Sequence, residues 1–254
     1  MQAVVPAAGE GTRMRPLTAN RPKGLVEVAG DPLLAHVFDT LRPVVEECVV
    51  VTGYQGDQIV ERFGHSYRGL ELTYVRQSER RGLADALLQA ESHIDGSFIS
   101  LNGDNVLRAD LGGLVARHRE TGADAAAFVE RVSWERAREG AVLELTAGPD
   151  ASDVEGVTDR IPEQVAVTGV VEKPEEPPSR YIPRGCYVLS PAVFDACRLV
   201  TPGSTGEREL TDAVDLLLAA GRRFETVPLD GWCHNLNTPA DRDRVARRLD
   251  GADD

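Results

Sequence analysis

The stretch Pro6-Ala7-Ala8-Gly9-Glu10-Gly11-Thr12-Arg13-Met14-Arg15-Pro16-Leu17-Thr18 directly follows a short apolar run, residues 3–5, that is typical of a buried strand. Glycines let a backbone approach a phosphate closely and present its N–H groups to it, and Arg13 adds a fork of charged donors. A dinucleotide-binding fingerprint would need a third glycine where Met14 stands, and a P-loop would need Gly-Lys followed by Ser or Thr. We therefore interpret the stretch as a phosphate-binding loop of another kind.

Strand-like and helix-like apolar patterns alternate on both sides of this loop. The first half of the chain predicts strands at 3–5, 48–52, 70–75 and 98–101 and helices at 33–41, 57–63 and 83–93. The second half predicts strands at 125–130, 141–145, 165–172 and 186–189 and helices at 191–197 and 207–220. Such alternation predicts an α/β fold: a Rossmann-like, doubly wound, mostly parallel sheet with helices on both faces and its ligands beyond the carboxyl ends of the strands.

The composition limits the partners. The chain has 254 residues and a net charge of -13, which argues against nucleic acid or an anionic membrane as a partner. It has no run of 18 apolar residues and no basic segment followed by an apolar one near Met1, so we expect no membrane span and a cytoplasmic protein. The four cysteines lie far apart and are interpreted as ordinary thiols.

Only two of the 28 basic residues are lysines, Lys23 and Lys173. Acidic surfaces with almost no lysine suit proteins that work in concentrated salt, where the repulsion between carboxylates is screened. A codon bias that favours Arg and Ala explains the same composition, and both explanations stay open. Under either one, the positions of the two remaining lysines need a reason.

The motif Gly9-x-Gly11-Thr12-Arg13-x-x-Pro16-Leu17-Thr18, followed by Pro22-Lys23, resembles the signature of the sugar-phosphate nucleotidyltransferases, in particular the glucose-1-phosphate uridylyl- and thymidylyltransferases. The resemblance implies a nucleotidyltransferase (GT-A-like) fold. It also implies that the loop, with Ala7, Ala8, Gly9, Gly11 and Thr12, wraps the phosphates of the nucleotide. In the family, the arginine and lysine that align with Arg13 and Lys23 stabilise charge at the reacting centre.

Residues 77–86, Gln-Ser-Glu-Arg-Arg-Gly-Leu-Ala-Asp-Ala, look like the family's base-recognition segment. The resemblance implies that Gln77 and Gly82 read a pyrimidine edge and the ribose. Without the resemblance, a Gln before a Gly-opened helix is read only as a turn and a helix start.

Two positions resemble the family's ligands for Mg²⁺, a hard cation that takes oxygen ligands and bridges phosphates. Asp104 follows the strand at 98–101, although Gly-Asp-Asn is also ordinary turn chemistry. Residues 232–241 resemble the closing segment Trp-x-x-Asp-x-Gly-x-Pro-x-Asp, in which the first Asp is the second metal ligand. This chain has Asn235 there, and some relatives that make UDP-N-acetylglucosamine also carry Asn at that place. An amide oxygen can coordinate Mg²⁺ but adds no charge.

The sugar-phosphate end shows weaker likeness. Glu172-Lys173-Pro174 resembles the motif in which Glu binds sugar hydroxyls and Lys holds the sugar phosphate. Gly140-Ala141 stands where Tyr-Gly is common, and Thr205 stands where an Arg often helps to hold the phosphate. Arg184 replaces a small residue and is a candidate to supply that charge.

The resemblance covers residues 1–249, which we expect to form one domain with a nucleotide-binding half (1–107) and a sugar-phosphate-binding half (108–249). The polar, acidic stretch at 146–163 is interpreted as a surface insertion in the second half, and residues 250–254 as an acidic tail. The implied reaction is Mg²⁺-dependent: UTP or dTTP and a sugar 1-phosphate, with glucose 1-phosphate as first candidate, give a nucleotide sugar and pyrophosphate. Two alternatives stay open: a catalytically weak regulatory subunit that binds nucleotide sugars, and a GTP:mannose-1-phosphate guanylyltransferase. The oligomeric state, a homo-oligomer included, also stays open.

Overall fold

A computed structural model describes residues 1–146, 161, 165–203 and 206–251. Most of the expected insertion at 146–163, the last three residues of the acidic tail and Thr205 lie outside the described residues.

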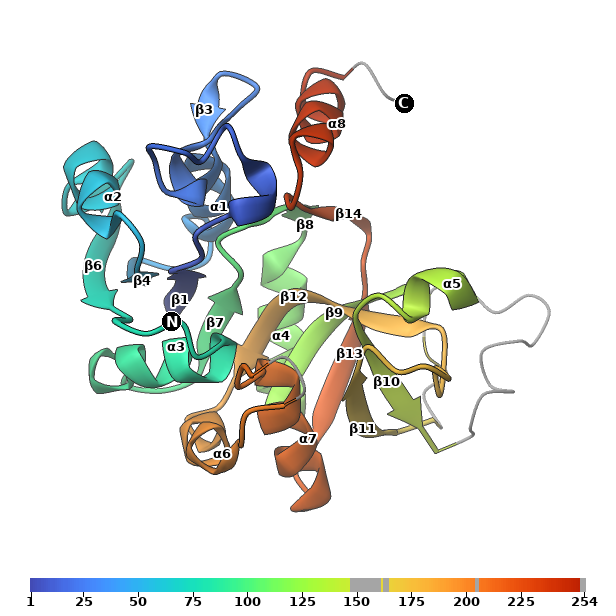
Figure 1. Cartoon of the computed structure of the whole chain (residues 1–254). Coiled ribbons are helices and arrows are strands. Elements are labelled where there is room, and N and C mark those ends of the chain that lie inside the picture. The colour runs from blue at the N-terminus through green and yellow to red at the C-terminus, as the bar shows by residue number, and fades with distance from the viewer. Residues whose placement is uncertain (147–160, 162–164, 204–205, 252–254) are drawn as a thin grey trace.

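The fold is built on an eight-stranded mixed sheet (Figure 1). In sheet order, its strands are β13 (Phe224–Pro228), β9 (Ala125–Arg131), β12 (Tyr181–Leu189), β7 (Phe98–Leu101), β1 (Gln2–Ala7), β4 (Glu47–Thr52), β6 (Leu70–Arg76) and β5 (Ser66–Tyr67). β7, β1, β4 and β6 pair in parallel, as do β13 and β9. β12 is antiparallel to both of its neighbours, and β5 is antiparallel to β6. The expected mostly parallel sheet is therefore confirmed.

Helices cover both faces of the sheet because successive strand residues point to opposite sides. In β1, Val4 packs in the core below α3 (Leu83–Ala90), α6 (Ala192–Leu199) and α7 (Leu210–Ala219). Its neighbours Ala3 and Val5 pack in the opposite core with α1 (Leu33–Leu41), α2 (Gly56–Phe63) and α4 (Leu111–Thr121). Continuous apolar runs such as residues 48–51 are fully buried, as a parallel strand that is covered on both faces requires.

Three two-stranded sheets complete the fold: β8 (Asn105–Ala109) with β14 (Gly231–Asn235), β10 (Ala141–Leu145) with β11 (Val167–Glu172), and β2 (Glu27–Val28) with β3 (Asp31–Pro32). The short helix α5 is Trp134–Ala137, α8 is Pro239–Leu249, and single 3-10 turns span Thr12–Met14, Lys23–Leu25 and Glu91–His93. A third core cluster joins Met14, Leu236 and Val245. The end of the chain therefore returns beside its beginning, and α8 lies next to the blue N-terminal segment in Figure 1.

Several elements lie outside the sequence predictions, each for a local reason. Gly112 and Gly113 in the first turn of α4 weaken its helical pattern. β13 is an edge strand of the sheet that ends on Pro228. α8 buries only Val245, so it shows almost no apolar face. The helix predicted at 207–220 begins only at Leu210, because Glu209 is extended, with ψ 146°.

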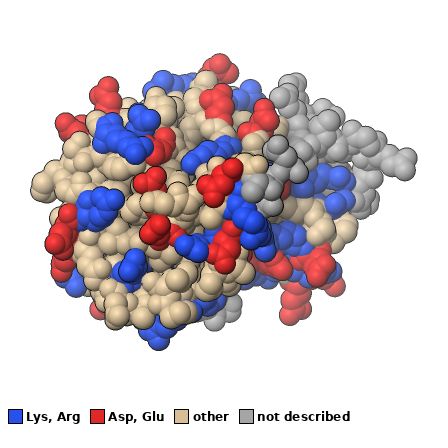
Figure 2. All heavy atoms as spheres, turned by 90° about the horizontal axis from the view of Figure 1, so that it is seen from above, with Lys and Arg blue, Asp and Glu red and all other residues tan. Residues whose placement is uncertain are grey.

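The surface carries charges of both signs. On the face in Figure 2, Lys and Arg are interspersed with Asp and Glu rather than gathered in one basic patch.

Among the described residues, no helix is long and apolar enough to cross a membrane. The four cysteines are free and buried, and burial raises the pKa of the Cys233 thiol to about 11, so it stays protonated near neutral pH.

If the acidic composition reflects a saline environment, thermal stability should rise steeply between ~0.1 M and ~2 M KCl, because salt screens the self-repulsion of a chain with net charge -13. Melting temperatures across a KCl series measure this. A melting temperature that is flat over that range would favour codon bias as the explanation.

Candidate active site

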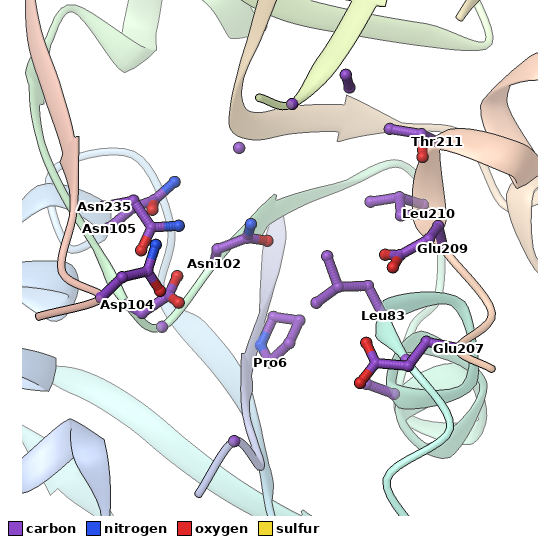
Figure 3. A pocket seen from close by; sticks show the side chains of 18 of the residues that line it. Pro6, Leu83, Asn102, Asp104, Asn105, Glu207, Glu209, Leu210, Thr211 and Asn235 are labelled. Atoms are coloured by element: carbon purple, nitrogen blue, oxygen red, sulfur yellow. The ribbon is translucent and has the colours of Figure 1, made fainter. Parts of the chain in front are cut away.

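One cavity of about 810 Å³ opens at the carboxyl ends of β1 and β7. Figure 3 shows side chains from both halves of the chain around it, with Asp104 and Asn235 on one side and Glu207 and Glu209 on the other. Fifteen residues were predicted as candidate site residues, and all of them line this cavity: Ala7, Ala8, Gly9, Gly11, Thr12, Arg13, Lys23, Gln77, Gly82, Asp104, Gly140, Glu172, Lys173, Arg184 and Asn235. The fold thus brings together positions that are spread over more than 200 residues of sequence.

The phosphate-loop candidate is held in one conformation. Gly11 has φ +64°, a left-handed value that favours glycine. A Cβ at Gly11 would lie 3.0 Å from Thr18 Cγ2 and 3.1 Å from Lys23 Cβ. The Thr18 hydroxyl donates to the Gly11 carbonyl at 2.7 Å. The turn therefore packs directly on the segment that carries Lys23.

Three charged side chains and one amide form a network beside this loop. Lys23 Nζ lies 2.8 Å from Asp104 Oδ2. The Oδ1 atom of Asn237 lies 3.3 Å from an Arg13 guanidinium nitrogen and 3.4 Å from Lys23 Nζ. The side chain of Lys23 is only 12% exposed, whereas Arg13 is exposed. Two cations and one carboxylate leave an excess positive charge, which suits a phosphate ligand.

Gln77 is fixed at the other side of the loop. It is 5% exposed, and its Nε2 donates to the Gly82 carbonyl at 3.1 Å and to Asp85 Oδ2 at 2.8 Å. These bonds occupy the amide nitrogen, so the side-chain oxygen is the group left to accept a hydrogen bond from a ligand. Gly82 has φ +100°, and a Cβ there would lie 2.3 Å from the Arg208 carbonyl oxygen. Only glycine allows this approach between the Gln77 segment and the start of α7.

Asp104 and Asn235 lie on neighbouring backbone segments. Asn235 pairs with Asn105 at the end of the β8–β14 ladder, and the Leu236 N–H donates to the Asp104 carbonyl at 2.9 Å. The buried Oδ1 atoms of Asn102 and Asn105 have no hydrogen-bond partner. Oxygen donors of this kind fit a hard divalent cation such as Mg²⁺. No group of three His, Cys, Asp or Glu side chains among the described residues could hold a metal by itself, so substrate oxygens would have to complete the coordination.

The part of the cavity that is expected to hold the sugar phosphate combines Lys173 with several carboxylates. Lys173 is a non-glycine residue with φ +45°, its N–H donates to the Gly140 carbonyl at 3.0 Å, and its Nζ lies 3.5 Å from Glu172 Oε1. Thr211 Oγ1 donates to Glu172 Oε2 at 3.3 Å. Burial, followed by the charges of Glu172 and Glu207, raises the pKa of Glu209 above its ordinary value. This end is therefore built to accept hydrogen bonds from hydroxyl groups.

Arg184 also lines the cavity, but its guanidinium is engaged within the protein. Its Nε lies 3.2 Å from Glu130 Oε2, another of its nitrogens donates to the Cys233 carbonyl, and its side chain is 13% exposed. A sugar phosphate would have to compete with Glu130 for this charge.

Several polar residues that line the cavity were not predicted from sequence, among them Asn237, Glu209 and Thr211. Glu209 and Thr211 fall in a segment that was predicted to be a regular helix. Asn237 gave a weak signal, because it stands where the resembling segment has glycine. The structure shows that Asn237 contacts Arg13 and Lys23, which are more than 200 residues away in the sequence.

A model of the family described as "Nucleotidyl transferase" matches residues 2–234. The chain belongs to the nucleotidyl transferase family. It is 46% identical to the UTP–glucose-1-phosphate uridylyltransferase AglF of Haloferax volcanii, over 98% of this chain and 96% of that protein. It is 32% identical to a glucose-1-phosphate thymidylyltransferase of Streptomyces griseus, over 97% of this chain but only 65% of that protein.

Solved structures share the fold of this chain. A UDP-glucose pyrophosphorylase complexed with UDP-glucose has a TM-score of 0.83 at 22% identity, and the match covers 98% of each chain. A UDP-glucose pyrophosphorylase from Acinetobacter baumannii has a TM-score of 0.76 at 21% identity, over 98% of this chain and 92% of that chain.

Proposed function

We propose that this nucleotidyl transferase converts UTP or dTTP and a sugar 1-phosphate, with glucose 1-phosphate as first candidate, into a nucleotide sugar and pyrophosphate. The observation that carries the proposal is one cavity lined by Arg13, Lys23, Glu172 and Lys173. Lys23 contacts Asp104 and Glu172 contacts Thr211, and Figure 3 shows Asp104 and Thr211 on opposite sides of the cavity. A cavity of about 810 Å³ has room for a nucleotide and a sugar phosphate together. The 46% identity to the Haloferax volcanii protein supports the same reaction.

In this mechanism, a phosphate oxygen of the sugar 1-phosphate attacks the α-phosphorus of the nucleotide in line. The bond between the α-phosphorus and the bridging oxygen breaks, and pyrophosphate leaves on the opposite side. The nucleophile is already an anion, so no general base is needed. Arg13 and Lys23 neutralise charge on the nucleotide phosphates. Lys173 holds the sugar phosphate in place although the two anionic substrates repel each other.

A divalent cation, which we propose to be Mg²⁺, would be held by Asp104 and Asn235 and would supply charge neutralisation across the phosphates. The side chain of Lys23 contacts Asp104 in the described structure, so it would share this carboxylate with the cation or turn toward the phosphates.

The fixed amide of Gln77 favours particular bases. Its free oxygen is an acceptor, which is complementary to the ring N–H of uracil or thymine and not to the unprotonated ring nitrogen of cytosine. We therefore expect UTP and dTTP to be substrates and CTP to be a poor one. Guanine also has a ring N–H, so GTP belongs in any substrate panel.

Pyrophosphate release measured for UTP, dTTP, GTP and CTP against glucose, N-acetylglucosamine and mannose 1-phosphates tests the proposal. It predicts turnover with a pyrimidine nucleotide and a hexose 1-phosphate, and none without the sugar phosphate. Binding of a nucleotide sugar without turnover of any pair would instead indicate a regulatory subunit, and turnover only with GTP and mannose 1-phosphate would indicate a guanylyltransferase.

Lys173→Ala should lower turnover at least ~100-fold, because one charge-assisted contact to the sugar phosphate is lost, on the order of 3 kcal/mol. The melting temperature should not change, since the Lys173 side chain is 53% exposed. Lys173→Arg should also be impaired, because a planar fork does not replace a compact ammonium. Arg119→Ala, which removes an exposed charge on α4, is the matched control and should retain activity. Full activity of Lys173→Ala would contradict the assignment of the sugar-phosphate end.

A further inference from the structure

Asn237 lies where the closing segment meets the phosphate loop. Its Oδ1 atom is within 3.3 Å of Arg13 and 3.4 Å of Lys23, the two cations assigned to the nucleotide phosphates. These contacts are long, and such hydrogen bonds can tighten when a ligand binds. One amide oxygen thus contacts both cations from a third segment of the chain.

The backbone of Asn237 is anchored on both sides. Its own N–H and that of Thr238 donate to Asp241 Oδ2 at 3.1 and 2.8 Å, and Asp241 N–H donates back to Thr238 Oγ1, which closes the capping box of α8. On the other side, the Leu236 N–H donates to the Asp104 carbonyl. The amide is therefore held by the backbone that carries Asp104 and by the first turn of α8.

The segments on either side of Asn237 also pack against the phosphate loop. Leu236 and Val245 share a buried cluster with Met14, the residue after Arg13. Leu236 and Met14 are completely buried, and Val245 is 1% exposed. The position of Asn237 relative to Arg13 is thus set by close packing rather than by the hydrogen bonds alone.

The chemical nature of this side chain matters because of the local charge. Arg13, Lys23 and Asp104 together carry a net charge of +1. An amide oxygen orients the two cations and leaves that charge in place. A carboxylate at the same position would cancel it and would repel the phosphates of the nucleotide.

We propose that Asn237 is a positioning residue that holds Arg13 and Lys23 toward the nucleotide phosphates without neutralising them. The inference rests on the proposed function, because it requires a nucleoside triphosphate at this end of the cavity. Position 237 should therefore require a neutral hydrogen-bond acceptor. Asp, although nearly isosteric with Asn, should be a worse substitute there than Ala.

The experiment compares Asn237→Ala, Asn237→Asp and the parent in UTP affinity, measured by calorimetry in the presence of a chelator, and in kcat and KM. Loss of the long hydrogen bonds from Arg13 and Lys23 should weaken UTP binding about 10-fold in Asn237→Ala. Asn237→Asp should weaken it further, by at least ~10-fold beyond the Ala variant, because it adds a repulsive charge. Gln89→Glu, which adds the same charge at an exposed position of α3, should bind like the parent.

A purely structural role gives the opposite order, because Asp preserves the shape of Asn and Ala does not. An Asp variant that binds UTP as well as or better than the Ala variant, or two variants that bind like the parent, would overturn the inference. Melting temperatures verify that all variants are folded. A parent that binds UTP but turns over no sugar 1-phosphate would contradict the proposed function alone, and the affinity series would still test Asn237.

Discussion

The Asp104→Asn variant is expected to lose turnover altogether, because it removes the anionic side chain of the candidate metal pair. Asn235 contributes an uncharged oxygen, so Asp104 supplies the negative charge of the pair that would attract a divalent cation. The substitution also leaves Lys23 without the carboxylate that lies 2.8 Å from it. The exchange of one oxygen for an amide nitrogen preserves size, and Asp104 is only partly buried, so the fold should survive.

A titration of the initial rate with Mg²⁺ for the parent, Asp104→Asn and Asn235→Asp measures this prediction. The parent should need added Mg²⁺ and should lose activity with a chelator. Asn235→Asp should reach half-maximal rate at a lower Mg²⁺ concentration, since two carboxylates attract the cation more strongly than one carboxylate and one amide. Metal-independent activity, or an Asp104→Asn variant that titrates like the parent, would show that the metal site is assigned wrongly.

Lys23→Ala is expected to lower turnover at least ~100-fold, on the order of 3 kcal/mol, because the proposed mechanism places its ammonium against the reacting phosphates. Lys23 is one of two lysines among 28 basic residues, and its side chain is 12% exposed at the cavity wall. Truncation also leaves Asp104 without its ion-pair partner, so repulsion between this carboxylate and the nucleotide adds to the loss.

Arg21→Ala is the matched control for Lys23→Ala. It removes a positive charge two residues away, from an exposed side chain that does not line the active-site cavity. It should retain activity within a few fold. Equal losses in the two variants would mean that general electrostatic attraction, rather than a specific contact, explains the effect.

The sequence predicted the parts of the fold that local patterns encode. The apolar run at 48–52 falls within β4 (Glu47–Thr52) because a parallel strand that is covered on both faces is continuously apolar. The amphipathic pattern at 33–41 coincides with α1 because a covering helix has apolar residues at a helical period. The loop at 9–13 was predicted because two glycines and an arginine at this spacing are typical of few other structures. α8 was missed because it is held by a capping box and one buried valine, Val245, instead of an apolar face.

Only those residues of the candidate site that belong to a local sequence motif could be predicted. Arg13, Lys23, Asp104 and Lys173 each belong to a motif, so their positions in one cavity could be anticipated. The contacts of Asn237 with Arg13 and Lys23 depend on how the end of the chain packs against its beginning. The engagement of Arg184 with Glu130 likewise depends on tertiary packing, and no local pattern encodes it.

The fate of the phosphorus atoms of UTP tests the proposed reaction. The protein is incubated with glucose 1-phosphate, Mg²⁺ and UTP that carries a radioactive label either at the α-phosphate or at the γ-phosphate, and the products are separated. We predict that the α label appears in UDP-glucose and the γ label in pyrophosphate, in equal amounts and only when the sugar phosphate is present. Release of the γ label as orthophosphate, or α label found only in UTP or UMP with no nucleotide sugar formed, would contradict attack of the sugar phosphate on the α-phosphorus and with it the proposed function.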